Sequence, residues 1–201
     1  MHHVPVMGWF DPITHNAYQA SLAPNPDRPE QPHYASQLGV FMPQLNVQVL
    51  AQEVDDLLIK EGQNGLLPTR SNPTDAGLDL YAAEDVLVTR FKPEFNDETH
   101  RVLVSTGIAA EVPPGLALFI WDRSGLSVKH GLHRVAGVVD SSYRGIIKVA
   151  LVNLTADDYM IHKGDRIAQA ILSPVILPVV NRVSSLSSTD RGAGGFGSTG
   201  R

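Results

Sequence analysis

The residues best suited to grip a phosphorylated ligand lie in the last eleven positions of the chain, residues 191–201. Five glycines there surround Phe196, two hydroxyls and two arginines. Glycine lets backbone N–H groups turn toward phosphate oxygens, the hydroxyls add donors, and arginine supplies a forked cation. The ring of Phe196 offers a face on which a base can stack. This composition indicates either a segment that closes over a phosphorylated, ring-bearing ligand or an ordinary unordered Gly/Ser tail.

A second candidate for phosphate binding is the run Arg123, Ser124 and Gly125, which follows a predicted strand. A guanidinium, a hydroxyl and a permissive glycine at a strand end suit a phosphate group. The alternative is a surface turn that carries an ordinary arginine.

Two carboxylates stand out in apolar surroundings. Asp140 follows the apolar run Gly137, Val138 and Val139. A lone carboxylate at the end of a buried strand is suited to act as a general base for water, or to cap the turn that follows. Asp79 lies between two leucines and points to the opposite face of its strand, where it is either solvated or close to a metal.

Composition excludes several classes of protein. The chain has 201 residues, 43% of them hydrophobic, which is enough for one domain with a core and an appendage. It has no cysteine, so disulfides and thiolate chemistry are excluded. A net charge of −5 argues against a nucleic-acid groove. Without a membrane-length apolar run or a signal-peptide pattern, we expect a cytoplasmic protein, in the host cytoplasm if viral.

Residues 1–44 differ from the rest of the chain. Seven prolines interrupt them, and five aromatic residues lie between: Trp9, Phe10, Tyr18, Tyr34 and Phe41. We therefore expect a mostly irregular extension, parts of which pack on the main body or on a partner protein. Residues 46–50 alternate like a strand, and residues 50–58 have helical spacing that ends before Gly62.

From Leu66 onward the sequence consists of short strand patterns separated by turn residues. Strands are predicted at residues 78–82, 86–88, 102–104, 107–112, 116–120, 137–139, 146–152 and 167–172. This spacing predicts an all-β sandwich, jelly roll or barrel. We place the domain at residues 45–182 and a flexible tail at residues 183–201.

Five segments in one order carry a family resemblance: residues 76–80, 123–127, 137–145, 163–169 and 191–200. Together they resemble the five motifs of the trimeric dUTPases, over about residues 66–201. The resemblance implies a homotrimer of jelly-roll-like β subunits whose active sites lie at subunit interfaces. It also implies Mg²⁺-dependent hydrolysis of dUTP to dUMP and pyrophosphate, which lowers dUTP and supplies dUMP for thymidylate synthesis. Neither nucleic acid nor a membrane is an expected partner.

Carried over by position, the third motif implies the hydrolytic and base-reading residues. Asp140 would orient the attacking water, and Tyr143 would pack against deoxyribose. The strand from Gly137 to Val139, with the returning segment near Lys148, would read uracil through backbone hydrogen bonds.

The first, second and fourth motifs imply phosphate and metal contacts. Arg123, Ser124 and Gly125 would hold phosphates from a neighbouring subunit, with Gln169 near them. Asp79 would lie near the Mg²⁺ ion and act on it through water.

The fifth motif implies a lid. Arg191 would act on the phosphates and Phe196 would stack on uracil, while Gly197, Ser198 and Thr199 would close over the γ-phosphate.

The chain also departs from the family pattern. Val135 occupies a place before Gly137 that is often held by glycine, so a differently shaped hairpin is expected there. Residues 46–65 are longer and more helical than the usual first strand. Two alternatives remain: a dCTP deaminase of the same fold, and a regulatory trimer that binds a protein partner through the N-terminal extension.

Overall fold

The computed structural model describes residues 43–91 and 101–194. Residues 1–42, where most of the predicted extension falls, lie outside the described residues, as do residues 92–100 and 195–201. The described elements, in chain order, are β1 (Asn46–Val49), α2 (Gln52–Lys60), β2 (Leu78–Tyr81), β3 (Val86–Val88), β4 (Arg101–Ser105), β5 (Ile108–Glu111), β6 (Leu116–Trp121), α3 (Ser124–His130), β7 (Leu132–Arg134), β8 (Val138–Val139), β9 (Lys148–Asn153), β10 (Tyr159–Ile161) and β11 (Arg166–Pro174).

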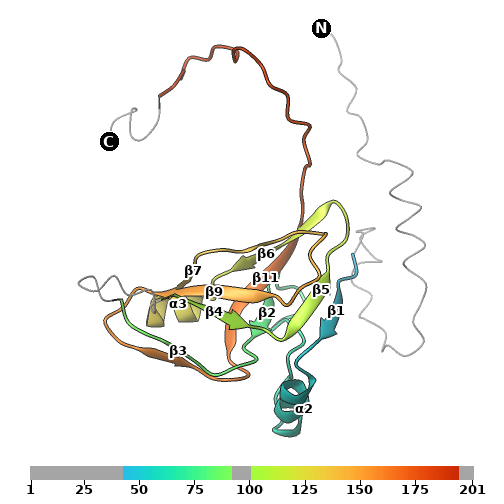
Figure 1. The fold of residues 1–201 in the computed structure, drawn as a ribbon, viewed down its shortest axis with the longest axis vertical. Helices are drawn as coiled ribbons and strands as arrows, with labels where there is room; N and C mark the ends of the chain where they lie inside the picture. Colours follow the sequence, from blue (N-terminus) through green and yellow to red (C-terminus); the bar gives the residue numbers. More distant parts are fainter. Residues whose placement is uncertain (1–42, 92–100, 195–201) are drawn as a thin grey trace. The chain divides into compact units, whose positions relative to one another are not determined.

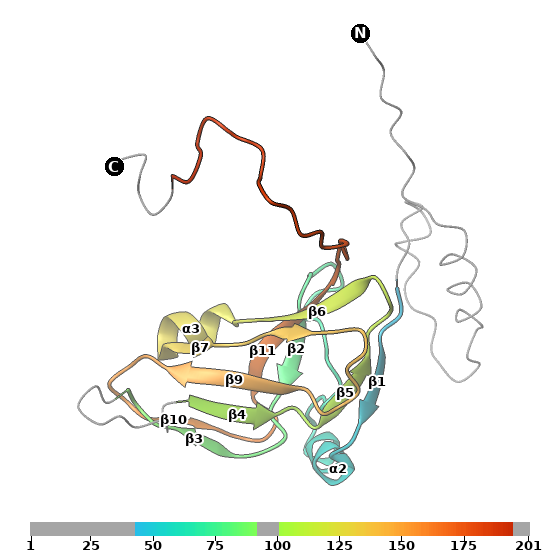
Figure 2. The same ribbon diagram turned by 45° about the horizontal axis from the view of Figure 1, so that its top comes forward.

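The strands form antiparallel sheets, in a chain predicted to be all-β. One sheet has the order β2-β11-β6-β8, and a second has the order β4-β9-β7. Two-stranded sheets, β1-β5 and β10-β3, complete the arrangement. Figures 1 and 2 show β9 beside β4, and β11 beside β2, in both views. The all-β, jelly-roll-like fold is thus confirmed.

One hydrophobic core joins the two larger sheets. Leu80, Leu118 and Ala170 from the first sheet and Val149 and Leu151 from the second are buried in the same cluster. The period-2 alternation of β6 explains this packing, because Leu118 and Ile120 face the core while Trp121 is exposed. The same alternation leaves the opposite face of β6 available for other contacts.

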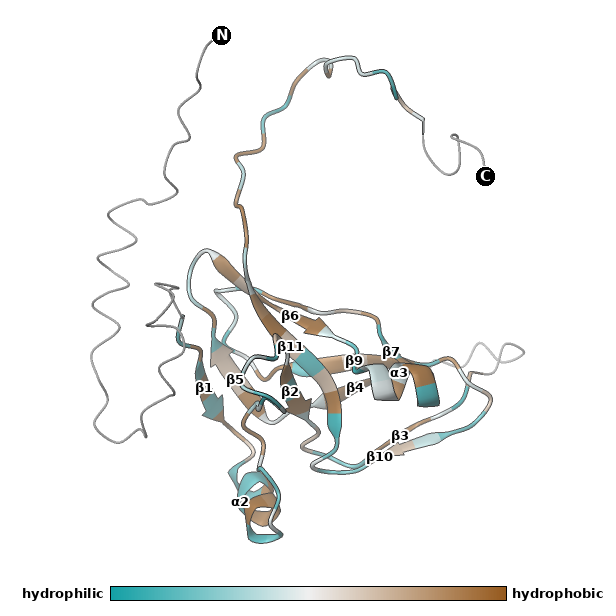
Figure 3. Cartoon of the chain, turned by 180° about the vertical axis from the view of Figure 1, so that it is seen from behind, coloured by the Kyte–Doolittle hydropathy of each residue, from teal (hydrophilic) through white to brown (hydrophobic). Residues whose placement is uncertain are grey.

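The helix predicted after the first strand is confirmed as α2. Figure 3 shows a hydrophobic and a hydrophilic side on α2, and Leu58 is buried in the core. The Asp55 carboxylate is also buried and accepts a hydrogen bond from the Leu66 N–H group. Gly65 has a φ of +69°, and a Cβ there would collide with that carboxylate. The helix is therefore fixed to the chain segment that leads into β2.

Three elements were not predicted. Residues 124–127 were expected as a turn, but they begin the helix α3. This helix buries no residue, so its sequence carries no apolar stripe that would have predicted it. It ends at Gly131, whose left-handed φ of 60° suits glycine. The strands β7 and β10 are three residues long, too short for a clear alternation. Their positions follow from pairing with β9 and β3.

Beyond Pro174, the described chain has no helix or strand, and the domain end at residue 182 stays a prediction. Apolar side chains remain exposed along this segment, including Leu177 at 79% and Val180 at 89%. Among the described residues, no helix is long and apolar enough to span a membrane.

Candidate active site

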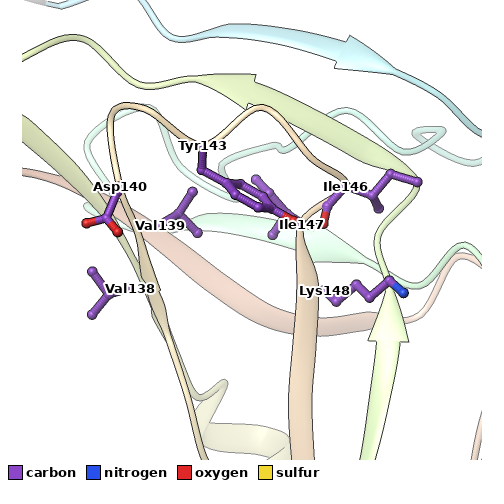
Figure 4. Close-up of a pocket in the computed structure, with 7 residues that line it drawn as sticks. All are labelled: Val138, Val139, Asp140, Tyr143, Ile146, Ile147 and Lys148. Carbon is purple, nitrogen blue, oxygen red and sulfur yellow. Dashed lines mark hydrogen bonds between the residues drawn. The ribbon is translucent and has the colours of Figure 1, made fainter.

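The first group of candidate residues lies on β8, on the loop that follows it and on the first residue of β9. A cavity of about 240 Å³, which we call the hairpin pocket, is lined by Val138, Val139, Asp140, Tyr143, Ile146, Ile147 and Lys148. Figure 4 shows the Tyr143 ring between the two arms of this loop, with Val138 and Asp140 at the outer side of one arm. Lys148 lies on the opposite arm, with its ammonium pointing away from Asp140.

β8 forms one wall of the hairpin pocket and is the edge strand of its sheet. It pairs with β6 on one side only, through Leu118 with Val139 and Phe119 with Val138. An edge strand leaves a row of backbone donors and acceptors unpaired. The hairpin pocket can therefore offer main-chain hydrogen bonds to a ligand.

The turn after β8 is held by its own hydrogen bonds. The Tyr143 N–H group donates to the Asp140 carbonyl oxygen at 3.1 Å, and the Tyr143 hydroxyl donates to the Ile146 carbonyl oxygen at 2.8 Å. A Cβ at Gly145 would lie 2.6 Å from the Tyr143 hydroxyl oxygen, so glycine gives the ring its space. The ring position is thus fixed from both sides of the turn.

Asp140 is exposed, and its carboxylate has no hydrogen bond or ion pair within the described residues. Its oxygens are free to accept from water. A carboxylate held at the start of a tight turn, beside an open pocket, has the geometry of a group that orients a nucleophilic water.

The second group, which we call the arginine cluster, consists of Asp79, Arg123 and Arg166. Arg123 Nε donates to one Asp79 carboxylate oxygen at 2.8 Å, and Arg166 Nη1 donates to the other at 3.2 Å. The Asp79 side chain is only 12% exposed, while Arg166 is 47% exposed. Asp79 therefore holds two guanidinium groups at the surface, where their remaining N–H groups can bind an anion.

Ser124 and Gly125 follow directly and form the exposed first turn of α3. The first N–H groups of a helix have no partner within it. A Cβ at Gly125 would meet nothing within 4 Å, so glycine is not required by packing in the described structure. Its effect is to leave the backbone accessible beside Arg123.

Gln169 lies in β11 between Asp79 and Trp121 on the neighbouring strands. Its side-chain Nε2 donates to the Asp122 carbonyl oxygen at 2.8 Å. A Cβ at Gly77 would lie 2.1 Å from Gln169 Oε1, so the glycine of the first motif makes room for this side chain.

Arg166 is a site residue that the sequence analysis did not single out. It lines, with Arg123, a second cavity of about 200 Å³, into which Tyr159 and Asp165 also project. Burial, and then the nearby Asp165 carboxylate, raise the pKa of the Tyr159 phenol. The available signal was the position of Arg166 inside the matched segment 163–169.

The hairpin pocket and the arginine cluster lie toward opposite ends of β6. Asp140 follows Val139, the partner of Leu118, whereas Arg123 lies beyond Trp121. At about 3.3 Å per residue, this separation is on the order of 15–20 Å. One chain therefore does not bring the two groups together.

The fifth motif is only partly described. Arg191 lies in a small turn, where its Nε donates to the Gly194 carbonyl oxygen at 2.9 Å. No contact joins Arg191 to the other candidate residues in the described part of the chain. Phe196, Gly197, Ser198 and Thr199 lie outside the described residues.

The described residues hold no group of three His, Cys, Asp or Glu side chains that could bind a metal ion. Both Asp79 oxygens already accept from arginines. A metal bound here would take most of its ligands from elsewhere.

An all-β domain with a backbone-lined pocket, a free carboxylate and a separate arginine cluster has the features of a protein that binds a phosphorylated compound. The chain belongs to the dUTPase family, because its residues 63–200 match the sequence model of that family.

A relative of known name supports the same family, and solved structures share the fold. A deoxyuridine 5'-triphosphate nucleotidohydrolase of Paramecium bursaria Chlorella virus 1 is 45% identical over 148 residues, which cover 73% of this chain and 99% of the relative. The dUTPase of Staphylococcus bacteriophage 80alpha, solved with dUpNHpp, is 25% identical with a TM-score of 0.63, covering 80% of this chain and 100% of that one.

A dUTPase of phage phi11 of S. aureus, described as coordinating a structural Mg(II) ion, shares the fold at 23% identity and a TM-score of 0.56, covering 71% of this chain and 98% of that one.

Proposed function

We propose that this chain is a dUTP diphosphatase, which hydrolyses dUTP to dUMP and pyrophosphate. Family membership supports this activity. The observation that carries it is the exposed Asp140 carboxylate at the end of the edge strand β8, beside the hairpin pocket. In the cytoplasm, where we expect the protein, this reaction lowers dUTP and supplies dUMP.

Uracil is read by the free edge of β8. Backbone donors and acceptors at fixed positions reject the exocyclic amine of cytosine, because it places a donor where an acceptor is needed. The methyl group of thymine overlaps the pocket wall. The Tyr143 ring, fixed by its hydrogen bond to Ile146, packs against deoxyribose and leaves no room for a 2'-hydroxyl.

Asp140 accepts a hydrogen bond from the attacking water and orients it toward the phosphorus atom. The reaction needs an oriented water and stabilised phosphate charge more than a strong nucleophile. No other role is required of the carboxylate, which matches its lack of a protein partner in the described structure.

The arginine cluster binds the phosphate chain. Arg123 and Arg166 supply guanidinium N–H groups, and the first-turn amides at Ser124 and Gly125 add neutral donors. Gln169 holds the segment between β6 and Arg123 in place through the Asp122 carbonyl oxygen. Because Asp79 fixes both guanidinium groups, the two arginine side chains lose little conformational freedom when substrate binds.

A divalent metal is expected from family membership, and we propose Mg²⁺. Mg²⁺ favours phosphate oxygens and retained waters over cages made only of protein ligands. The absence of a three-ligand cluster in the described residues fits an ion that arrives on the triphosphate, with Asp79 acting on it through water. When bound, the ion neutralises phosphate charge.

The active site is shared between chains of a homotrimer. Two observations support this arrangement: the hairpin pocket and the arginine cluster are separated within one chain, and the outward face of β6 and its neighbours is apolar. Phe119, Val138 and Ile171 lie on that face by register, with Val138 64% exposed. A partner chain would cover this face and complete the site.

The tail is the third contributor. Its exposed apolar residues between 176 and 186 gain partners only on another surface. Arg191 would then reach phosphates, while Phe196 stacks on the base and Gly197, Ser198 and Thr199 close the site against water.

The test measures pyrophosphate release from dUTP with Mg²⁺, and from dCTP, dTTP and UTP as alternative substrates. We expect turnover of dUTP alone, lost on chelation of the metal and retained after deletion of residues 1–44. Ammonia release from dCTP would instead identify a deaminase, and absence of dUTP turnover would refute the proposal.

A further inference from the structure

Arg134 and Trp121 form a stacked pair outside the motifs that the proposed function uses. The Arg134 guanidinium carbon lies 4.6 Å from the centre of the Trp121 ring. Trp121 ends β6 and is 48% exposed, and Arg134 ends β7. A guanidinium over an indole face is held by a cation–π interaction, and its hydrocarbon stem covers apolar surface.

Asp122, the next residue, holds the backbone of this pair in register. One of its carboxylate oxygens accepts from the Arg134 N–H group at 2.8 Å, and the other pairs with His133 Nδ1. The side chain of Asp122 thus ties the end of β7 to the segment that leads into Arg123.

Gly137, the residue directly before β8, lies beside the Arg134 side chain. A Cβ at position 137 would lie 2.6 Å from the Ile120 carbonyl oxygen and 3.3 Å from Arg134 Nη1. The Ile120 N–H group donates to the Gly137 carbonyl oxygen at 2.7 Å. Gly137 is therefore confined between β6 and Arg134.

The position of Arg134 is unfavourable in one respect. Its Nε atom is buried and has no hydrogen-bond partner within the described part of the chain. A buried unpaired N–H group lowers stability, so a merely structural residue at this place would be better as an apolar side chain.

We propose that Arg134 is a positioning residue for base recognition. Stacked on Trp121, it presses Gly137 against β6 and so fixes the start of β8, the wall of the hairpin pocket. The inference rests on the proposed function, since it assigns a residue to the base side of the same site. The chain accommodates Val135 in place of glycine because its N–H group continues the β7–β9 pairing, donating to the Ala150 carbonyl oxygen at 3.0 Å.

The test compares Arg134→Ala, Arg134→Lys and Trp121→Ala with the parent protein. The measurements are the dissociation constant of dUMP, KM and kcat for dUTP, and the melting temperature. Lys129→Ala is the matched control, because it removes a long basic side chain from the adjacent helix α3.

We expect Arg134→Ala to raise the dUMP dissociation constant and KM about tenfold, with kcat within about threefold, on the scale of a lost stacking and packing contact. Arg134→Lys, which keeps the charge and most of the stem, should recover most of that loss. In the double variant with Trp121→Ala, the dUMP dissociation constant and KM should be no more than about twice those of either single variant, because the two side chains act as a unit.

Unchanged dUMP binding and KM in Arg134→Ala, beside an active parent, would overturn the inference. The inference would also be overturned if the loss of dUMP affinity paralleled a lower melting temperature and disappeared on cooling. Absence of dUTP turnover in the parent would instead refute the proposed function, so the two failures are distinguishable.

Discussion

The hairpin pocket and the arginine cluster differ in what shapes them, and in the proposed function they recognise different parts of the substrate. The hairpin pocket is lined mainly by apolar side chains and the free edge of β8, together with Asp140, Tyr143 and Lys148, and its shape is held by hydrogen bonds within a turn. The arginine cluster relies on charge, with two guanidiniums fixed by one nearly buried carboxylate. In the function we propose, a flat, uncharged base is selected by backbone geometry, whereas a triphosphate is bound by preorganised cations.

This difference can be measured with two ligands. Binding of dUMP, which has one phosphate, reports mainly on the hairpin pocket. The additional affinity of a non-hydrolysable dUTP analogue reports on the arginine cluster. Variants of the two regions should therefore change different quantities.

The largest effect is expected for Asp140→Asn. The amide cannot accept a proton from the attacking water, so kcat should fall at least about 100-fold, the usual scale of general-base loss. Affinity for dUMP should stay within about twofold. Asp56→Asn, an exposed aspartate on α2, is the control for loss of a negative charge. Turnover within a few-fold of the parent would remove Asp140 from the mechanism.

A smaller and differently distributed effect is expected for Asp79→Asn. Loss of the shared carboxylate charge releases Arg123 and Arg166, so kcat/KM for dUTP should fall about 10- to 100-fold. The dUMP dissociation constant should change by less than about threefold. Titration calorimetry with dUMP and with the dUTP analogue separates the two. An equal loss for both ligands would show that the two regions are not independent.

The smallest effect is expected for Tyr143→Phe, which keeps the ring and removes only the hydrogen bond to Ile146. A neutral hydrogen bond contributes about 0.5–1.5 kcal/mol, so KM should rise about two- to tenfold with little change in kcat. Discrimination against UTP should weaken in parallel, because the ring is less firmly held. A change in kcat alone would contradict the assignment of Tyr143 to sugar packing.

The sequence predicted the features that depend on local pattern. The strand-and-turn texture predicted the all-β fold. The residues of the third motif lie together in the hairpin pocket because a short apolar run, a carboxylate and a turn adjoin in sequence. The first helix was predicted from its spacing, because Leu58 faces the core. These features depend on residues that are neighbours along the chain.

Other features depend on contacts between distant residues and were missed. α3 buries no side chain, so it has no apolar period to detect. The role of Asp79 as the anchor of two arginines requires Arg123 and Arg166, 44 and 87 residues away. The stacked pair of Trp121 and Arg134 depends on the register of β6 and β7, which the sequence of a three-residue strand does not specify. In the trimer that we propose, the relation of the tail to the site depends on a second chain.

The central claim is that the hairpin pocket of one chain works with the arginine cluster of another. It is tested most directly by mixing two inactive variants, Asp140→Asn and Arg123→Ala, by co-refolding at equal concentration and assaying pyrophosphate release from dUTP. In a ring-shaped trimer with random mixing, about one site in four combines two intact halves, so activity should return to about a quarter of the parent value. A mixture no more active than the separate variants would contradict a site shared between chains.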